Sequence, residues 1–131
     1  MTSPAIQPIT PGATPAGHYS PGISWNGLVF VSGQLPFPPG ATDRTVGTIK
    51  EQVGQAMANV EGVLTAGGSS LSQLLSVTIY ITDIELWGAV NDEYARIMGA
   101  HRPSRAIVPV LPLHYDCQVE IQAIGAVTPH P

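Results

Sequence analysis

The sequence predicts an α+β domain in which two helices cover one face of a mixed sheet, in the order β-β-α-β-α-β-β. Two observations carry this prediction. In two segments apolar residues recur at three- and four-residue steps, as on one face of a helix, and in others they alternate with polar residues, as on a half-buried strand. The chain has 131 residues and shows no repeat or linker, so we expect one domain over residues 1–131.

The amino-terminal part of the chain is predicted to be extended. Four prolines within residues 1–17 disfavour a helix, and we expect residues 1–14 to form an extended segment. The apolar run of residues 27–33 is bounded by glycines and is typical of a strand. Residues 18–23 are expected to pair with that strand.

The first helix is predicted to begin after Thr48. A hydroxyl at Thr48 and a carboxylate at Glu51 have the spacing of a capping box, which satisfies two free backbone N–H groups. Gly67 and Gly68 are typical of the helix end. The predicted buried face consists of Ile49, Val53, Met57, Val60 and Leu64.

A strand, a second helix and two more strands are predicted to follow. Residues 75–82 alternate between apolar and polar side chains, with Leu75 among the apolar positions, and Asp83 is a candidate cap for the next helix. The predicted buried stripe of that helix is Leu86, Val90, Tyr94 and Ile97 or Met98. Residues 106–110 and 117–127 complete the sheet. On the last strand Gln118, Glu120 and Gln122 face away from Val119, Ile121 and Ala123.

The composition excludes several classes of protein. Charged residues make up only 11% of the chain, against about 25% in an ordinary domain, which predicts that part of the surface is buried in a homo-oligomer. A net charge of −4 without a basic run argues against nucleic acid as a partner. We expect no membrane segment, no signal peptide, no metal site and a cytoplasmic location.

Two charged residues are candidates for chemistry. Arg105 stands at the expected start of a strand, where its guanidinium can bind a carboxylate, although an ion pair at a surface or subunit interface explains it as well. Glu120 can hold a water molecule and move a proton if its face looks into a cleft; otherwise it lies on an exposed sheet face. Tyr19, Ser32 and Asn91 can each offer a hydrogen bond to a ligand.

Eight short segments, in this order and spacing, resemble the Rid family of reactive enamine/imine deaminases, also called YjgF-type or endoribonuclease L-PSP-like proteins. The resemblance runs from about residue 9 to residue 127. The segments are PAGHYS (15–20), GLVFVSGQLP (27–36), residues 52–59, LTAGG (64–68), VTIYITD (77–83), NDEY (91–94), PSR (103–105) and VEI (119–121).

The resemblance implies a chorismate-mutase-like fold, assembled as a homotrimer with clefts between subunits. It also implies a metabolite-damage activity, the hydrolysis of 2-imino and 2-enamino acids to 2-keto acids and ammonium, without a cofactor. By position, Arg105 would bind the substrate carboxylate and Glu120 would orient the attacking water. Tyr19 would close over the ligand. Ser32, Asn91 and backbone groups of Ile107 are the remaining positions that would line the cleft.

The chain departs from the family pattern at four places. His18 and Pro21 replace the usual proline and glutamine beside Tyr19, and Ile107 stands where a smaller residue is common. Residues 113–116, LHYD, replace a more usual turn of the Lys-Gly-Ala type. These departures bear on substrate preference. The alternative function is a regulatory protein that binds a small carboxylate in the same cleft without turnover.

Overall fold

A computed structural model describes residues 5–128 as one mixed sheet with two helices. Expectations that fall on residues 1–4 and 129–131 lie outside the described residues. The strands are β1 (Gln7–Ile9), β2 (Gly22–Trp25), β3 (Leu28–Gln34), β4 (Leu74–Ile81), β5 (Ser104–Pro109) and β6 (Val119–Ala126). The helices are α1 (Ile49–Ala66) and α2 (Trp87–Met98), with short 3-10 turns at Leu71–Gln73, Ile84–Leu86 and His114–Asp116.

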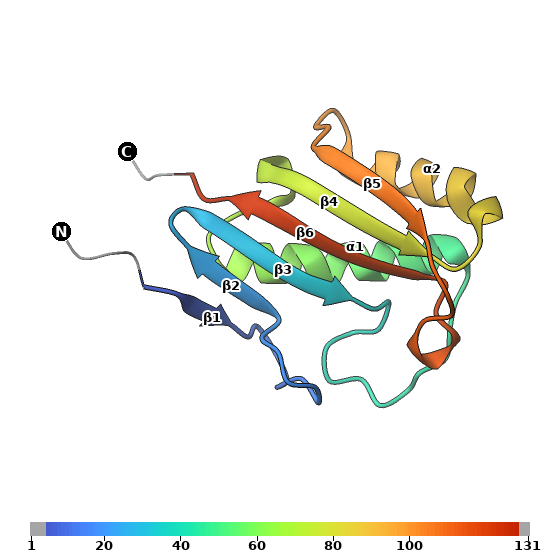
Figure 1. Ribbon diagram of the computed structural model, residues 1–131, viewed down its shortest axis with the longest axis horizontal. Coiled ribbons are helices and arrows are strands. Elements are labelled where there is room, and N and C mark those ends of the chain that lie inside the picture. Colours follow the sequence, from blue (N-terminus) through green and yellow to red (C-terminus); the bar gives the residue numbers. More distant parts are fainter. Residues whose placement is uncertain (1–4, 129–131) are drawn as a thin grey trace.

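The six strands are ordered β1-β2-β3-β6-β4-β5, so that β1 and β5 form the two edges of the sheet (Figure 1). All neighbouring strands are antiparallel except β4 and β5, which run parallel and are connected through α2. The carboxyl-terminal strand β6 lies between β3 and β4, in the middle of the sheet. This position places residues of β6 next to segments from both halves of the chain.

Both helices lie on the same face of the sheet and leave the other face uncovered (Figure 1). Alternate side chains of the central strands are buried beneath the helices, among them Val77 and Ile79 of β4 and Val119 and Ile121 of β6. The intervening residues of the same strands face away from the helices, because successive side chains of a strand point to opposite faces. Neighbouring residues of one strand therefore lie on opposite sides of the sheet.

The predicted α+β class and the placement of two helices on one face are confirmed, while one strand was not predicted and two local predictions are wrong. The extended segment contains a further strand, β1, which pairs with β2. The strand expected at residues 18–23 lies at Gly22–Trp25 instead. Leu74, and not Leu75, is buried, because the register between β4 and β6 shifts between Leu74 and Ser76 and moves Leu75 out of the core.

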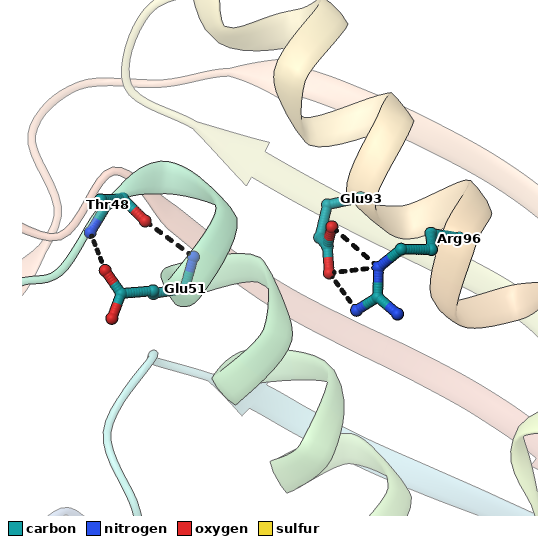
Figure 2. A network of polar contacts seen from close by, with 4 residues as sticks. All are labelled: Thr48, Glu51, Glu93 and Arg96. Carbon is teal, nitrogen blue, oxygen red and sulfur yellow. Dashed lines mark hydrogen bonds and ion pairs between the residues drawn. The ribbon is translucent and has the colours of Figure 1, made fainter.

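The capping box predicted for α1 is present, and it is shown in Figure 2. The Glu51 backbone N–H donates to Thr48 Oγ1 over 3.2 Å, and the Thr48 N–H donates to Glu51 Oε1 over 3.1 Å. Asp83 caps the 3-10 turn that precedes α2, so α2 itself begins later, at Trp87. Figure 2 also shows the ion pair between Glu93 and Arg96 of α2, which holds the pKa of the Glu93 carboxyl below its usual range.

Candidate functional site in two halves

Arg105 lies on the helix-covered side of the sheet, at its β5 edge. Its Cα partner on β4 is Val77, a buried core residue, so the two side chains share a face. The guanidinium reaches α2, where Nη1 donates to Asn91 Oδ1 over 2.9 Å. It also lies 5.0 Å from the ring centroid of Tyr94 and 5.7 Å from that of Trp87. The structure therefore brings two of the predicted site residues, Arg105 and Asn91, into direct contact.

A cavity of about 530 Å³ opens beside Arg105, between α2 and the segment that leads into β5. Its lining includes two arginines, Arg102 and Arg105, and no carboxylate. Within residues 5–128, Arg105 forms no ion pair. The ion-pair explanation of Arg105 thus has no support within the chain, and the cavity has the charge that suits a small anion.

Glu120 lies on the uncovered side of the sheet. Its neighbours Val119 and Ile121 are buried beneath the helices, and its Cα partner on β4 is Tyr80. The Glu120 side chain packs against Gly33 of β3, where an added Cβ would stand 3.0 Å from Glu120 Cδ. Burial raises the pKa of the Glu120 carboxyl, while the nearby positive charge of His114 lowers it by a smaller amount. Glu120 therefore keeps its proton to a higher pH than an ordinary glutamate.

Ser32 lies on the uncovered face, as Glu120 does, and is bonded to the segment that carries Tyr19. Ser32 Oγ donates to the Ser20 carbonyl over 2.6 Å, and the Ser32 N–H donates to the Pro21 carbonyl over 2.9 Å. These bonds fasten the segment that carries Tyr19 to β3, one residue from the glycine that contacts Glu120. The Tyr19 ring is 56% exposed, so it is free to contact a ligand or a second subunit.

Ile107 takes the position on β5 beside Ile79 and packs its side chain against the core. Only its backbone groups are placed to meet a ligand, because β5 is an edge strand with one unpaired side. The larger side chain at this position is therefore partly buried against the core.

The predicted site residues form two separate halves within one chain. Val77 and Tyr80, the β4 partners of Arg105 and Glu120, lie three residues apart and on opposite faces. At about 3.3 Å per residue this is roughly 10 Å along the strand, in addition to the thickness of the sheet. We call the group around Arg105 and Asn91 the arginine half-site, and the group around Glu120, Gly33, Ser32 and Tyr19 the glutamate half-site. The two halves do not meet within a single chain.

Sequence reasoning missed some members of each half. Trp87 and Tyr94 flank Asn91 at steps of four and three residues on α2, so helical spacing from Asn91 could have identified both as neighbours of Arg105. Gly33 lies on β3, far from Glu120 in the sequence, and His114 lies in the irregular segment before β6, so no regular spacing indicates either residue. Among residues 5–128, no group of three His, Cys, Asp or Glu side chains could hold a metal ion, and no helix is long and apolar enough to cross a membrane.

This sheet, with two helices on one face and an arginine at one edge, defines a small α+β domain of the Rid/YjgF type. The sequence model described as Endoribonuclease L-PSP matches residues 10–127. The chain therefore belongs to the YjgF/RutC/Rid family, as its resemblance indicated.

Individual relatives agree with this assignment. A RutC family protein of Pyrococcus horikoshii is 36% identical over 111 residues, which cover 85% of this chain and 88% of the relative. TdcF of Escherichia coli, provisionally named a reactive intermediate deaminase, is 32% identical over 118 residues, covering 88% of this chain and 89% of TdcF.

Solved structures share the same fold. A Rid family protein of unknown function from Yersinia pestis, YyfA, superposes with a TM-score of 0.87 at 34% identity, over 94% of this chain and 100% of that protein. The structure of Escherichia coli TdcF with bound serine gives a TM-score of 0.83 at 29% identity, over 93% of this chain and 99% of TdcF.

Proposed function

We propose that the protein hydrolyses reactive 2-imino acids, and their 2-enamino tautomers, to 2-keto acids and ammonium. The observation that supports this most directly is that Arg105 has no ion-pair partner among residues 5–128 while Glu120 has a raised pKa. The Arg105 guanidinium lies beside a cavity whose lining holds no carboxylate, and the Glu120 carboxyl is half-buried. A carboxylate-bearing substrate and a proton-transfer step use these two properties together.

The two halves are proposed to combine across subunits of a homotrimer. The arginine half-site of one protomer would face the glutamate half-site of the next. The two halves could then bind the same substrate molecule although they are separated within one chain. The uncovered sheet face suits burial in such an assembly, because Phe30 and Val108 stand exposed on it. Backbone groups of Ile107, on the free edge of β5, would then lie at the junction.

In the proposed reaction, Arg105 binds the substrate carboxylate, and Asn91 and the two rings of α2 keep its guanidinium in place. Glu120 accepts a proton from a water molecule, whose oxygen adds to the iminium carbon. Glu120 then returns the proton to the nitrogen of the resulting carbinolamine. The C–N bond breaks, the hydroxyl proton passes to the departing ammonia, and ammonium and the carbonyl of the 2-keto acid form. The iminium carbon is already electrophilic, so positioning and one proton relay suffice.

The test is hydrolysis of 2-iminobutanoate, generated from threonine by a dehydratase and trapped as its semicarbazone. Wild-type protein should lower semicarbazone formation, and both Arg105→Ala and Glu120→Gln should lose most of this effect. Lys50→Ala serves as the control, because Lys50 is an exposed cation on α1 that does not line the cavity beside Arg105 and belongs to neither half-site.

A folded trimer that does not change semicarbazone formation would contradict the proposal. Binding of 2-oxobutanoate without turnover would then favour the regulatory function. The name of the matching family also refers to a ribonuclease, but a net charge of −4 argues against RNA as substrate.

A further inference from the structure

A cluster of one cation and two aromatic rings lies next to the glutamate half-site, and the proposed function does not use it. The Arg44 guanidinium stands 5.2 Å from the ring centroid of Phe37 and 5.0 Å from that of Tyr115. The two rings meet edge to face, with their centroids 5.8 Å apart. We call Phe37, Arg44 and Tyr115 the Arg44 cluster. It joins the loop that follows β3 to the loop that precedes β6.

The Arg44 cluster lies on the loops at the end of the β3–β6 pair that carries Glu120, where Gln34 pairs with Ile121. Phe37 follows four residues after Gly33, the residue against which Glu120 packs. The His114 ring, whose charge acts on Glu120, lies 5.9 Å from the ring of Tyr115. Arg44 is therefore a second cation at the end of the β3–β6 pair that carries Glu120.

The loops that carry the cluster are fastened to the core. Asn59 Nδ2 donates to the carbonyls of Leu35 and Phe37, over 3.0 and 2.8 Å, and so fixes the backbone at Phe37. Gln52 Nε2 donates to the Gly47 carbonyl over 2.9 Å and to Gln118 Oε1 over 3.0 Å. The cluster is thus presented on two loops tied to α1, which limits the entropy lost when it binds a ligand.

The backbone of the second loop is strained. Tyr115 and Asp116 both adopt left-handed conformations, with φ of 59° and 60°, which residues other than glycine rarely adopt. Such conformations cost free energy, and they concentrate at functional sites. At Tyr115 this conformation accompanies a ring held against Phe37 and Arg44. This loop, LHYD, is also one of the places where the sequence departs from the family pattern.

The Arg44 guanidinium has donors left for a ligand. One of its N–H groups is bonded to the Ala41 carbonyl. No carboxylate within residues 5–128 pairs with Arg44, since neighbouring Asp43 accepts instead from the N–H and hydroxyl of Thr45, over 2.8 and 2.6 Å. A guanidinium held between rings, with its remaining donors free, suits a carboxylate.

We propose that the Arg44 cluster binds a second carboxylate of the substrate, so that the preferred substrates are 2-imino dicarboxylic acids. This inference rests on the proposed function. In it, Arg105 takes the carboxylate next to the imine, Glu120 acts at the imine carbon, and Arg44 takes the carboxylate at the far end of the side chain. Asp116 lies nearby and is exposed, so its charge opposes the attraction of Arg44 and limits the preference.

The experiment compares two stable keto-acid products and the two corresponding imines. Calorimetry measures binding of 2-oxoglutarate and 2-oxobutanoate, and semicarbazone trapping measures hydrolysis of 2-iminoglutarate and 2-iminobutanoate, both generated by amino-acid oxidases. Wild-type protein should bind 2-oxoglutarate about five- to tenfold more tightly than 2-oxobutanoate, as expected for one charge-assisted contact at a partly exposed site. Arg44→Gln should reduce this ratio to within about twofold, and the Lys50→Gln control should retain it.

The outcomes separate this inference from the proposed function. If the protein hydrolyses 2-iminobutanoate but shows no preference for the dicarboxylic compounds, the proposed function stands and the inference is wrong. If neither imine is hydrolysed but the binding preference is present and depends on Arg44, the inference on recognition stands and the deaminase proposal fails. A preference that survives Arg44→Gln, or no measurable binding of 2-oxoglutarate, overturns the inference.

Discussion

Gly33 and Glu120 contact each other across the β3–β6 pair, and the contact depends on the absence of a side chain at residue 33. An added Cβ would lie 3.0 Å from Glu120 Cδ and 3.1 Å from Oε2. The β3–β6 register shifts between Val31 and Gln34, so Gly33 lies in an irregular part of the pairing, where one strand carries an extra residue. The glutamate half-site is therefore shaped by the backbone of β3 as much as by its own side chains.

Gly33→Ala should displace the Glu120 carboxyl and lower kcat more than it raises KM. A shift of a few tenths of an ångström at a proton-transfer group is expected to cost about tenfold in rate. Steady-state imine hydrolysis measures both constants. Gly62→Ala is the matched control, because Gly62 lies inside α1 with open space at its Cβ position, and alanine there should stabilise the helix by about 1 kcal/mol. Equal activity in both variants would show that the contact does not position Glu120.

Glu120→Gln should raise thermal stability relative to wild type more at pH 8 than at pH 4. Burial raises the pKa of the Glu120 carboxyl above its value in the unfolded chain. Its contribution to stability is therefore full below the unfolded pKa and is lost as the pH rises through the folded pKa. Glutamine does not titrate and avoids that loss. Thermal unfolding of the assembled protein at the two pH values measures the difference, and a gap that does not change with pH would contradict the burial of Glu120.

Tyr94→Phe should leave the fold intact and stabilise it by about 1 kcal/mol. The Tyr94 hydroxyl is buried without a hydrogen-bond partner among residues 5–128. Burying an unpaired hydroxyl costs free energy, and phenylalanine avoids that cost. The aromatic ring beside the Arg105 guanidinium is retained in phenylalanine. Chemical denaturation measures the free energy of unfolding. Destabilisation by more than about 1 kcal/mol would mean that the hydroxyl has a partner in the assembled protein.

The elements that depend on local patterns could be predicted from the sequence. The hydroxyl and carboxylate at Thr48 and Glu51 define the start of α1 because both partners lie within one helical turn. The exposure of Leu75 could not be predicted, because it results from a register shift against β6, a strand distant in the sequence. β1 was missed for a different reason: three residues in a proline-rich segment show no alternation long enough to indicate a strand.

The candidate site could be predicted only in part. The residue types and family positions indicated Arg105 and Glu120, but each needs its strand partner before its face is known. Arg105 shares a face with Val77, and Glu120 shares the opposite face with Tyr80. The separation into two half-sites is therefore determined by how the strands pair. No single segment of the sequence reveals that pairing.

The central claim, that each site combines Arg105 of one protomer with Glu120 of another, is tested most directly by mixing two inactive variants. Arg105→Ala and Glu120→Gln chains are denatured, combined in equal amounts and refolded into trimers, and imine hydrolysis is measured. Random assembly of a closed trimer should restore about one site in four, because a site is intact only when each protomer supplies its unaltered residue. Recovery of about a quarter of wild-type activity is the result we predict. Activity no higher than that of the separate variants, in correctly assembled mixed trimers, would contradict the account.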